Sequence, residues 1–208
     1  MTRNCRRTLL ALPLVLLFGC SEPPKQKAES KKKEPEKPAE PISARSAFQQ
    51  IFASARTWAP DAQILKLANI RVEGVKDHGG KCGAWQAILV SPSRNKQKMF
   101  TYSVVEGPGN LHKGVFGTPE ETYTPRGQAK PFLIAALKVD SDQAFETAMK
   151  KGAEYAKKNP DLPISFLLEL TPQNQNPTWR VLWGESVSTS NYSIVIDAST
   201  GEYLRTLR

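Results

Sequence analysis

The residues best suited to chemistry in this 208-residue chain are few and scattered. The two histidines, His78 and His112, lie in polar stretches near glycines, and no Gly-x-Ser-x-Gly or other nucleophile motif accompanies them. Asp77, His78 and Cys82 offer a carboxylate, an imidazole and a thiol, which all suit zinc, but a structural zinc site needs four ligands and a catalytic site three plus water. The sequence therefore predicts no metal site, no cofactor and no catalytic residue.

The glycine-rich segment Gly107-Pro108-Gly109 could suggest a nucleotide-binding loop. It lacks the third glycine and the following helix that a dinucleotide site requires. We therefore expect this segment to form a turn.

Nucleic acid is not an expected partner either, because the basic residues behind the net charge of +9 are dispersed rather than clustered. A mildly basic chain would still be attracted to acidic polymers of a cell envelope.

A different chemistry, covalent lipidation, is suggested at Cys20. Three arginines open the chain, residues 8–18 are uncharged and mainly apolar, and Gly19 precedes the cysteine, which is the pattern of an export signal. The apolar stretch has about a dozen residues, and a permanent transmembrane helix needs ~20. Residues 1–20 are therefore predicted to be a cleaved signal peptide.

Leu17-Phe18-Gly19-Cys20 resembles the bacterial lipobox, in which a branched apolar residue and a small residue precede a cysteine that becomes lipidated. The resemblance implies a diacylglycerol group and an additional acyl chain such as palmitate on Cys20, and more than one chain gives stable membrane anchoring. Ser21 then implies sorting to the outer membrane, facing the periplasm. The alternatives are an ordinary signal peptide cut elsewhere or an uncleaved buried helix.

Residues 21–41 interleave lysines and glutamates with prolines and contain no large apolar side chain. Such a segment cannot bury enough apolar surface to offset its ordering entropy. Its prolines favour extended conformations, so it would hold the folded part away from the membrane. We predict a disordered tether, although a lysine run could instead bind nucleic acid or anionic lipid.

Cys82 would be the only free thiol of the mature chain, because Cys5 leaves with the signal peptide and Cys20 is acylated. No intramolecular disulfide is then possible. An unpaired thiol in an oxidising compartment can form mixed disulfides or be oxidised. The reading that we favour is a small, partly buried residue that leads into a strand at Trp85.

The remaining residues, 42–208, are sufficient for a sizeable core. Apolar side chains recur at helical spacing over residues 44–55, with Ser43 as a plausible N-cap. A second stripe covers residues 144–156, preceded by Asp140 or Ser141 as the cap and ended by an Asn-Pro pair. Two amphipathic helices are therefore expected.

Strand patterns supply a sheet for these helices to cover. Residues 164–171 alternate in polarity, and residues 192–197 are rich in β-branched side chains. Residues 197–201 are expected to form a turn in which Gly201 adopts a positive φ, and residues 202–207 to return as a final strand. These elements predict an α+β fold.

Tryptophans raise a choice between core packing and an exposed aromatic binding face. Trp85 alternates with Ala87 and Leu89, and Trp179 with Val181 and Trp183, on the strands that carry them. The alternation favours one sheet face under the helices. Trp58 raises the same choice, and we expect most of the four tryptophans to be core residues.

An aromatic order also occurs twice at similar spacing: Phe48, Trp85 and Tyr102, then Phe145, Trp179 and Tyr192. Self-similarity of this kind indicates repeated structural units. The sequence therefore predicts two helix-plus-antiparallel-sheet units in tandem, over residues 42–123 and 124–208. Their sheets could be joined edge to edge or packed as a pseudo-symmetric pair.

The segments Trp179-Arg180-Val181 and 194–202, preceded by 139–145, resemble a PepSY-type domain, in which a helix is followed by strands bearing Trp-x-Val and Asp-Ala-x-Thr-Gly. The resemblance covers residues 139–208 and is fainter over 42–123. It implies a cystatin-like unit with a binding or inhibitory role in the envelope, often toward peptidases, and no catalytic residues. For Asp197 and Gly201 we favour turn chemistry over a ligand role.

The leading hypothesis is a lipid-anchored, non-catalytic module of the cell envelope that engages a protein or peptide partner, including a peptidase that it restrains. The alternative is a carrier or chaperone for a lipophilic ligand held between helix and sheet. A small hydrolase is a third hypothesis, disfavoured because no nucleophile and base pair is evident. An apolar cleft would favour the carrier, and an exposed strand edge or a pair of loops would favour the peptide binder.

Overall fold

The computed structural model describes residues 39–208 except 110, 126 and 128. The predicted signal peptide 1–20, the lipidation residue Cys20 and nearly all of the 21–41 tether lie outside the described residues. These assignments stay predictions. Among the described residues, no helix is both long and apolar enough to cross a membrane.

Helix α1 (Ala44–Trp58) begins where the sequence predicts. The Ser43 side chain accepts a hydrogen bond from the backbone N–H of Ser46 and so caps the first turn. The side chains of the predicted stripe lie against the sheet, and Phe48 and Ile51 are buried. The 3.6-residue period therefore located both the helix and its buried face.

The second predicted helix is divided into α2 (Ser141–Lys151) and α3 (Ala153–Lys158). Asp140 is the N-cap of α2, and Gln143 completes a capping box with it. The interruption at Gly152 has a steric reason, since a Cβ atom there would lie 2.8 Å from the ring of Trp183. Glycine lets the chain pass close over this buried ring, so the expectation of one continuous helix was wrong.

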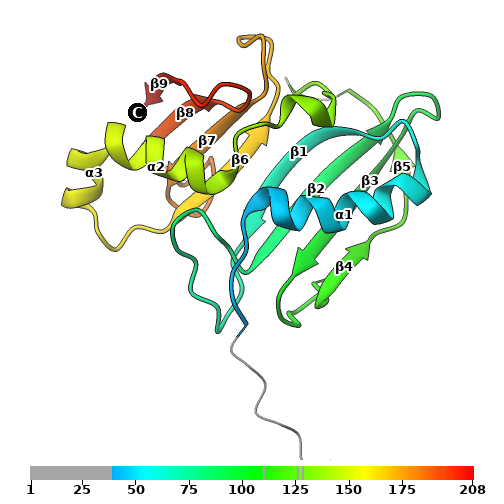
Figure 1. Cartoon of the computed structure of the whole chain (residues 1–208), viewed down its shortest axis with the longest axis horizontal. Coiled ribbons are helices and arrows are strands. Elements are labelled where there is room, and N and C mark those ends of the chain that lie inside the picture. Colours follow the sequence, from blue (N-terminus) through cyan, green and yellow to red (C-terminus); the bar gives the residue numbers. More distant parts are fainter. Residues whose placement is uncertain (1–38, 110, 126, 128) are drawn as a thin grey trace, which may run out of the picture. The chain divides into compact units, whose positions relative to one another are not determined.

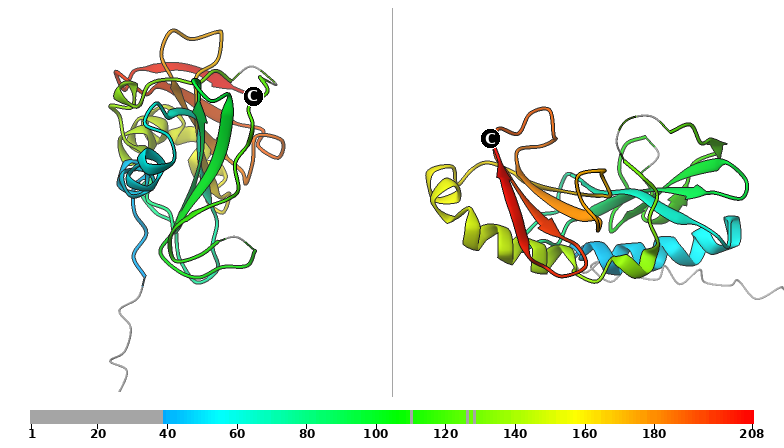
Figure 2. Two further views of the ribbon diagram at one scale, coloured as in Figure 1. Left: turned by 90° about the vertical axis from the view of Figure 1, so that its right-hand side faces the viewer. Right: turned by 90° about the horizontal axis from the view of Figure 1, so that it is seen from above.

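The strands form a single antiparallel sheet in the order β4-β3-β2-β1-β6-β7-β8-β9, with β5 paired to β3. The helices lie on one face of it (Figures 1 and 2). This arrangement confirms the α+β class. The strands are β1 (Gln63–Ile70), β2 (Ala84–Ser91), β3 (Lys96–Ser103), β4 (Gly114–Gly117), β5 (Glu121–Thr122), β6 (Ile164–Glu169), β7 (Thr178–Trp183), β8 (Ser193–Asp197) and β9 (Tyr203–Leu207).

The sheet is continuous because β1 pairs with β6 at its centre, where Leu67 lies opposite Leu168. From this pair outward the strands follow in chain order on both sides. The connection between the two halves crosses the same region, since Phe132 bridges to Ile64. It also contains the short helix η1 (Ile134–Ala136). All the described strands thus belong to one continuous sheet.

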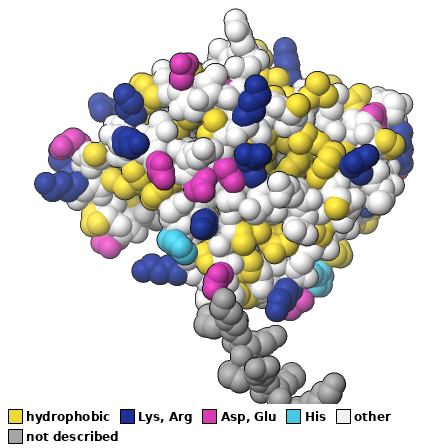
Figure 3. Space-filling model, viewed as in Figure 1, with side chains coloured by type: hydrophobic (Ala, Val, Ile, Leu, Met, Phe, Trp, Pro, Cys, Tyr) yellow, Lys and Arg dark blue, Asp and Glu magenta, His cyan; other side chains and the backbone are white. Residues whose placement is uncertain are grey.

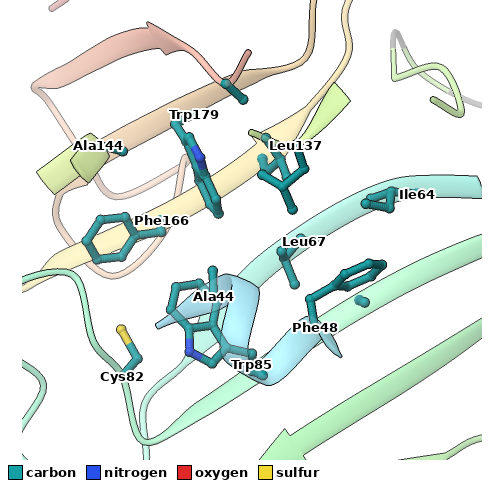
Figure 4. Close-up of a cluster of buried hydrophobic side chains, with 14 of the residues drawn as sticks. Ala44, Phe48, Ile64, Leu67, Cys82, Trp85, Leu137, Ala144, Phe166 and Trp179 are labelled. Atoms are coloured by element: carbon teal, nitrogen blue, oxygen red, sulfur yellow. The ribbon is translucent and has the colours of Figure 1, made fainter. Parts of the chain in front are cut away.

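Aromatic side chains from both halves meet in the core beneath the helices (Figure 4). Trp85 and Trp179 are fully buried, with ring centroids 6.4 Å apart, and Phe166 contacts both rings. Trp183 is also buried, whereas Trp58 is only partly buried at the end of α1. The expectation of core positions for most tryptophans is confirmed.

The two central tryptophans also make matching hydrogen bonds. The indole N–H of Trp85 donates to the carbonyl oxygen of Ile42, and that of Trp179 donates to Val139, both at 2.9 Å. Each acceptor is the residue just before the N-cap of a helix. Each tryptophan lies on the second strand after its helix, so the two halves place it in the same way.

The turn expected between β8 and β9 is confirmed. Asp197 accepts hydrogen bonds from the backbone N–H groups of Ser199 and Thr200 at 2.7 and 3.0 Å, and these bonds help to lower its pKa against the opposing effect of burial. Gly201 has a φ of 81°, as such a turn requires. Asp197 and Gly201 therefore have the structural role that the sequence favoured.

Candidate functional site

Three of the residues considered for chemistry lie together in the connection between β1 and β2, residues 71–83, which we call the hairpin. These are Asp77, His78 and Cys82. His112 lies elsewhere, 3.3 Å from a carboxylate oxygen of Glu106 and packed against the ring of Phe116. Within the described part of the chain, no group of three or more His, Cys, Asp or Glu side chains could hold a metal ion.

The tip of the hairpin is a tight turn held against helix α2. Backbone hydrogen bonds of 3.0 and 2.8 Å join His78 and Lys81, and Gly79 and Gly80 between them have positive φ. The hydroxyl of Ser141 donates to the carbonyl oxygen of Gly80 at 2.7 Å. A Cβ atom on Gly80 would lie 2.5 Å from the Ser141 carbonyl oxygen. Glycine is therefore required for the tip to pack this closely on α2.

The base of the hairpin is fixed by Asp77 and Cys82. The Asp77 carboxylate accepts the backbone N–H of Gly83 at 2.9 Å, and partial burial raises the pKa of Asp77. Cys82 exchanges two backbone hydrogen bonds with Ile42 and is fully buried, where the sequence suggested partial burial. Burial also raises the pKa of its thiol, so little reactive thiolate forms. Cys82 is thus a packing residue, the role that we favoured.

A cleft of about 520 Å³ lies between the hairpin and the segment that leads into β6. We call it the hairpin cleft. Val72 and Val75 contribute apolar side chains from the hairpin, and Phe145 from α2 and Phe166 from β6 contribute aromatic ones. Leu162, on the opposite wall, is 39% exposed. The cleft therefore has an apolar lining drawn from both halves of the sheet.

The charged residues of the hairpin cleft lie mainly on the hairpin side. Arg71, Lys76 and Lys81 are exposed lining residues, and the exposed Asp161 lies on the opposite wall. His78 is exposed at the tip, with Nδ1 3.3 Å from the carbonyl oxygen of Lys76. The arrangement can bind apolar groups and place charges around them. Asp77 and His78 both line the hairpin cleft, whereas Cys82 is buried and does not line it.

A free sheet edge was the other feature expected of a peptide binder. Tyr203 and Leu204 on the edge strand β9 are 38% and 39% exposed. The pairing of β9 shifts register there, since Arg205 lies opposite Val195 while Tyr203 lies opposite Ile196. An irregularity of this kind protects an edge against further strand pairing. We therefore place the candidate site at the hairpin cleft.

The sequence identified some of these residues but not the cleft. Phe145 was interpreted as part of a helix stripe and of the repeated aromatic order, Phe166 as part of a strand, and Leu162 was not singled out. No local pattern joins residues 71–81 to residues 145–166, because their proximity depends on the central pairing of β1 with β6. The local signal that the sequence does offer is a leucine, Leu162, between Pro160 and Pro163.

No family model, curated protein or solved structure matches the chain.

Proposed function

We propose that this chain is a non-catalytic binding module that engages a protein or peptide partner through the hairpin cleft. The observation that carries the proposal is a preformed cleft with an apolar, partly aromatic lining and charged groups around it. Binding sites typically combine such a lining with a few polar groups that orient the ligand. An exposed leucine at the wall, Leu162, is suited to contact another protein.

Preorganisation of the hairpin supports this proposal. The hairpin is anchored at its tip by the bond between Ser141 and Gly80, and at its base by the bond between Gly83 and Asp77. A loop held in this way loses little conformational freedom when a partner binds, which favours affinity. A side chain of a partner would find the cleft already formed.

A binding role fits the lining better than catalysis does. Among the described residues that line the hairpin cleft there is no serine, threonine, cysteine or tyrosine to act as a nucleophile. The thiol closest in sequence, Cys82, is buried. The alternative of a lipophilic carrier would need space between helix and sheet, and Ile51, Trp85 and Trp179 fill that layer.

The tandem PepSY-like organisation is part of the same proposal. Two observations support it: the strands follow in chain order outward from the β1–β6 pair, and Trp85 and Trp179 make matching hydrogen bonds. We propose units over residues 42–123 and 124–208. The PepSY resemblance adds a partner class, since such domains often restrain peptidases.

We also propose that the chain is anchored by acyl groups on Cys20 in the outer membrane, with the folded part facing the periplasm. Replacing Cys20 with alanine should abolish incorporation of labelled palmitate and release the chain from the membrane fraction. Radiolabelled palmitate and membrane fractionation measure both effects. Palmitate retained on the Cys20→Ala chain would contradict the assignment.

Site-specific cross-linking tests the proposed partner site. A photoreactive phenylalanine analogue at position 162 should form an adduct in cells, whereas the analogue at position 187 should not. Val187 is a matched control because it is 44% exposed, close to the 39% of Leu162. The adduct should be reduced by excess unlabelled wild-type chain and not by Leu162→Glu chain. Equal adducts at both positions would contradict the proposal.

A further inference from the structure

A second hollow of about 430 Å³ lies beneath α3 beside the hairpin cleft, and we call it the helix hollow. Pro160, Leu162 and Ile164 line both spaces and form the wall between them. Beyond this wall, Met149 and Ala156 add further apolar surface, and the buried ring of Trp183 lies at the base of the hollow. An apolar track with two depressions thus extends from the hairpin to α3.

The charges around this track are unevenly distributed. Over the helix-bearing face as a whole, acidic and basic side chains are dispersed (Figure 3). The lining of the two hollows is more basic than this face as a whole. It contains four basic side chains and two acidic ones, which are Arg71, Lys76, Lys81 and Lys157, and Asp77 and Asp161. The track therefore presents apolar depressions within a positively charged border.

We infer that the segment bound here is acidic and has two apolar anchor side chains, one for the hairpin cleft and one for the helix hollow. This inference rests on the proposed function and names the partner's chemistry. Transfer of the apolar anchor side chains from water into the two depressions favours binding, and the exposed Leu162 lies between the depressions. Carboxylates beside the anchors meet the lysines and the arginine of the border, which selects against basic segments.

A displayed library of random peptides is the probe that tests this inference on the purified full chain. Peptides enriched by the wild-type chain should have a net negative charge and two large apolar residues. Their affinity should fall by about tenfold or more in roughly 1 M salt, because salt screens exposed charges. The Leu162→Glu chain should not enrich them.

Charge-reversal variants test whether binding depends on where the lysines lie or only on the net charge of the chain. The variant Lys81→Glu/Lys157→Glu changes two lining residues, whereas Lys150→Glu/Lys158→Glu changes two exposed lysines that lie outside the lining. Both variants have the same net charge. We expect selected acidic peptides to bind the first at least about tenfold more weakly and the second within about twofold of wild type. Urea unfolding of each variant controls for folding.

The outcomes distinguish the inference from the proposed function. Enrichment of neutral or basic peptides that depends on Leu162 would overturn the inference and leave the proposed site in place. Equal loss of binding in the two charge variants would also overturn the inference, because position would not matter. Enrichment that is the same with wild-type and Leu162→Glu chains, or absent from both, would overturn the proposed function and the inference with it.

Discussion

Replacing Trp179 with phenylalanine tests whether the two halves of the sheet share one core. Trp179 is fully buried, and its indole N–H donates to the Val139 carbonyl oxygen at 2.9 Å. Phenylalanine cannot donate, and a carbonyl left without its partner costs about 1–2 kcal/mol. The smaller ring adds about 1 kcal/mol for the space that it leaves. We therefore expect the free energy of unfolding to fall by about 2–3 kcal/mol.

Two further substitutions provide the comparison. Trp85→Phe should cost a similar amount, because the Trp85 indole is equally buried and donates to Ile42 at the same distance. Trp58→Phe should cost less than about 1 kcal/mol, since the Trp58 indole donates to the exposed carboxylate of Glu120. Comparison of these variants distinguishes the effect of losing a buried hydrogen bond from the effect of replacing any indole ring.

Urea unfolding of the full chain measures these effects. With a slope of about 1–3 kcal/mol per molar urea, the Trp179→Phe midpoint should fall by about 1 M. The double variant with Trp85→Phe should depart from additivity by about 0.5–1.5 kcal/mol, because the two rings are in contact. Two separate transitions, each shifted by only one of the substitutions, would refute a shared core.

Three other predictions concern the hairpin. Gly80→Ala should lower the free energy of unfolding, measured with urea, by about 2–3 kcal/mol, because the added Cβ would clash with α2. Gly79→Ala should lower it by only about 1 kcal/mol, because Gly79 has a positive φ but open space around it. Burial raises the pKa of Asp77 above its usual 3.8, so the folded chain binds this proton more tightly than the unfolded chain. Stability should therefore fall as pH rises from 3.8 to the raised pKa of the folded chain and level off beyond it. Asp77→Asn should remove that decline from the pH profile of the urea midpoint, and an unchanged profile would contradict the assignment. Cys82 should resist iodoacetamide in the native chain and react with it in denaturant, because burial shields the thiol and raises its pKa. Mass spectrometry measures the labelling, and rapid labelling of the native chain would refute this prediction.

Local sequence patterns predicted several elements of the fold, because each of these depends on neighbouring residues. The period of the first stripe located α1 and Ser43 as its cap, and alternation placed Trp85 and Trp179 in the core. The break at Gly152 depends instead on the ring of Trp183, which reaches the helix from a distant strand. Helical periodicity cannot show such an approach.

The candidate site was less predictable because it is assembled from segments that are distant in sequence. Val72 and Phe166 belong to different halves and meet only after β1 pairs with β6. The sequence did mark Asp77 and His78 for attention, through their chemical type. Their structural context changed the interpretation, since the Asp77 carboxylate supports the hairpin and Cys82 is buried.

The same central pairing explains why the cleft is formed by the first-half hairpin. Because β1 and β6 are antiparallel neighbours, the chain leaving β1 emerges beside the segment that enters β6. The connection after β1, residues 71–83, is long enough to fold back and rest its Gly80 tip on α2. The corresponding connection after β6, residues 170–177, is shorter. The hairpin cleft thus depends on the length and glycine content of this one loop as well as on the central pairing of β1 with β6.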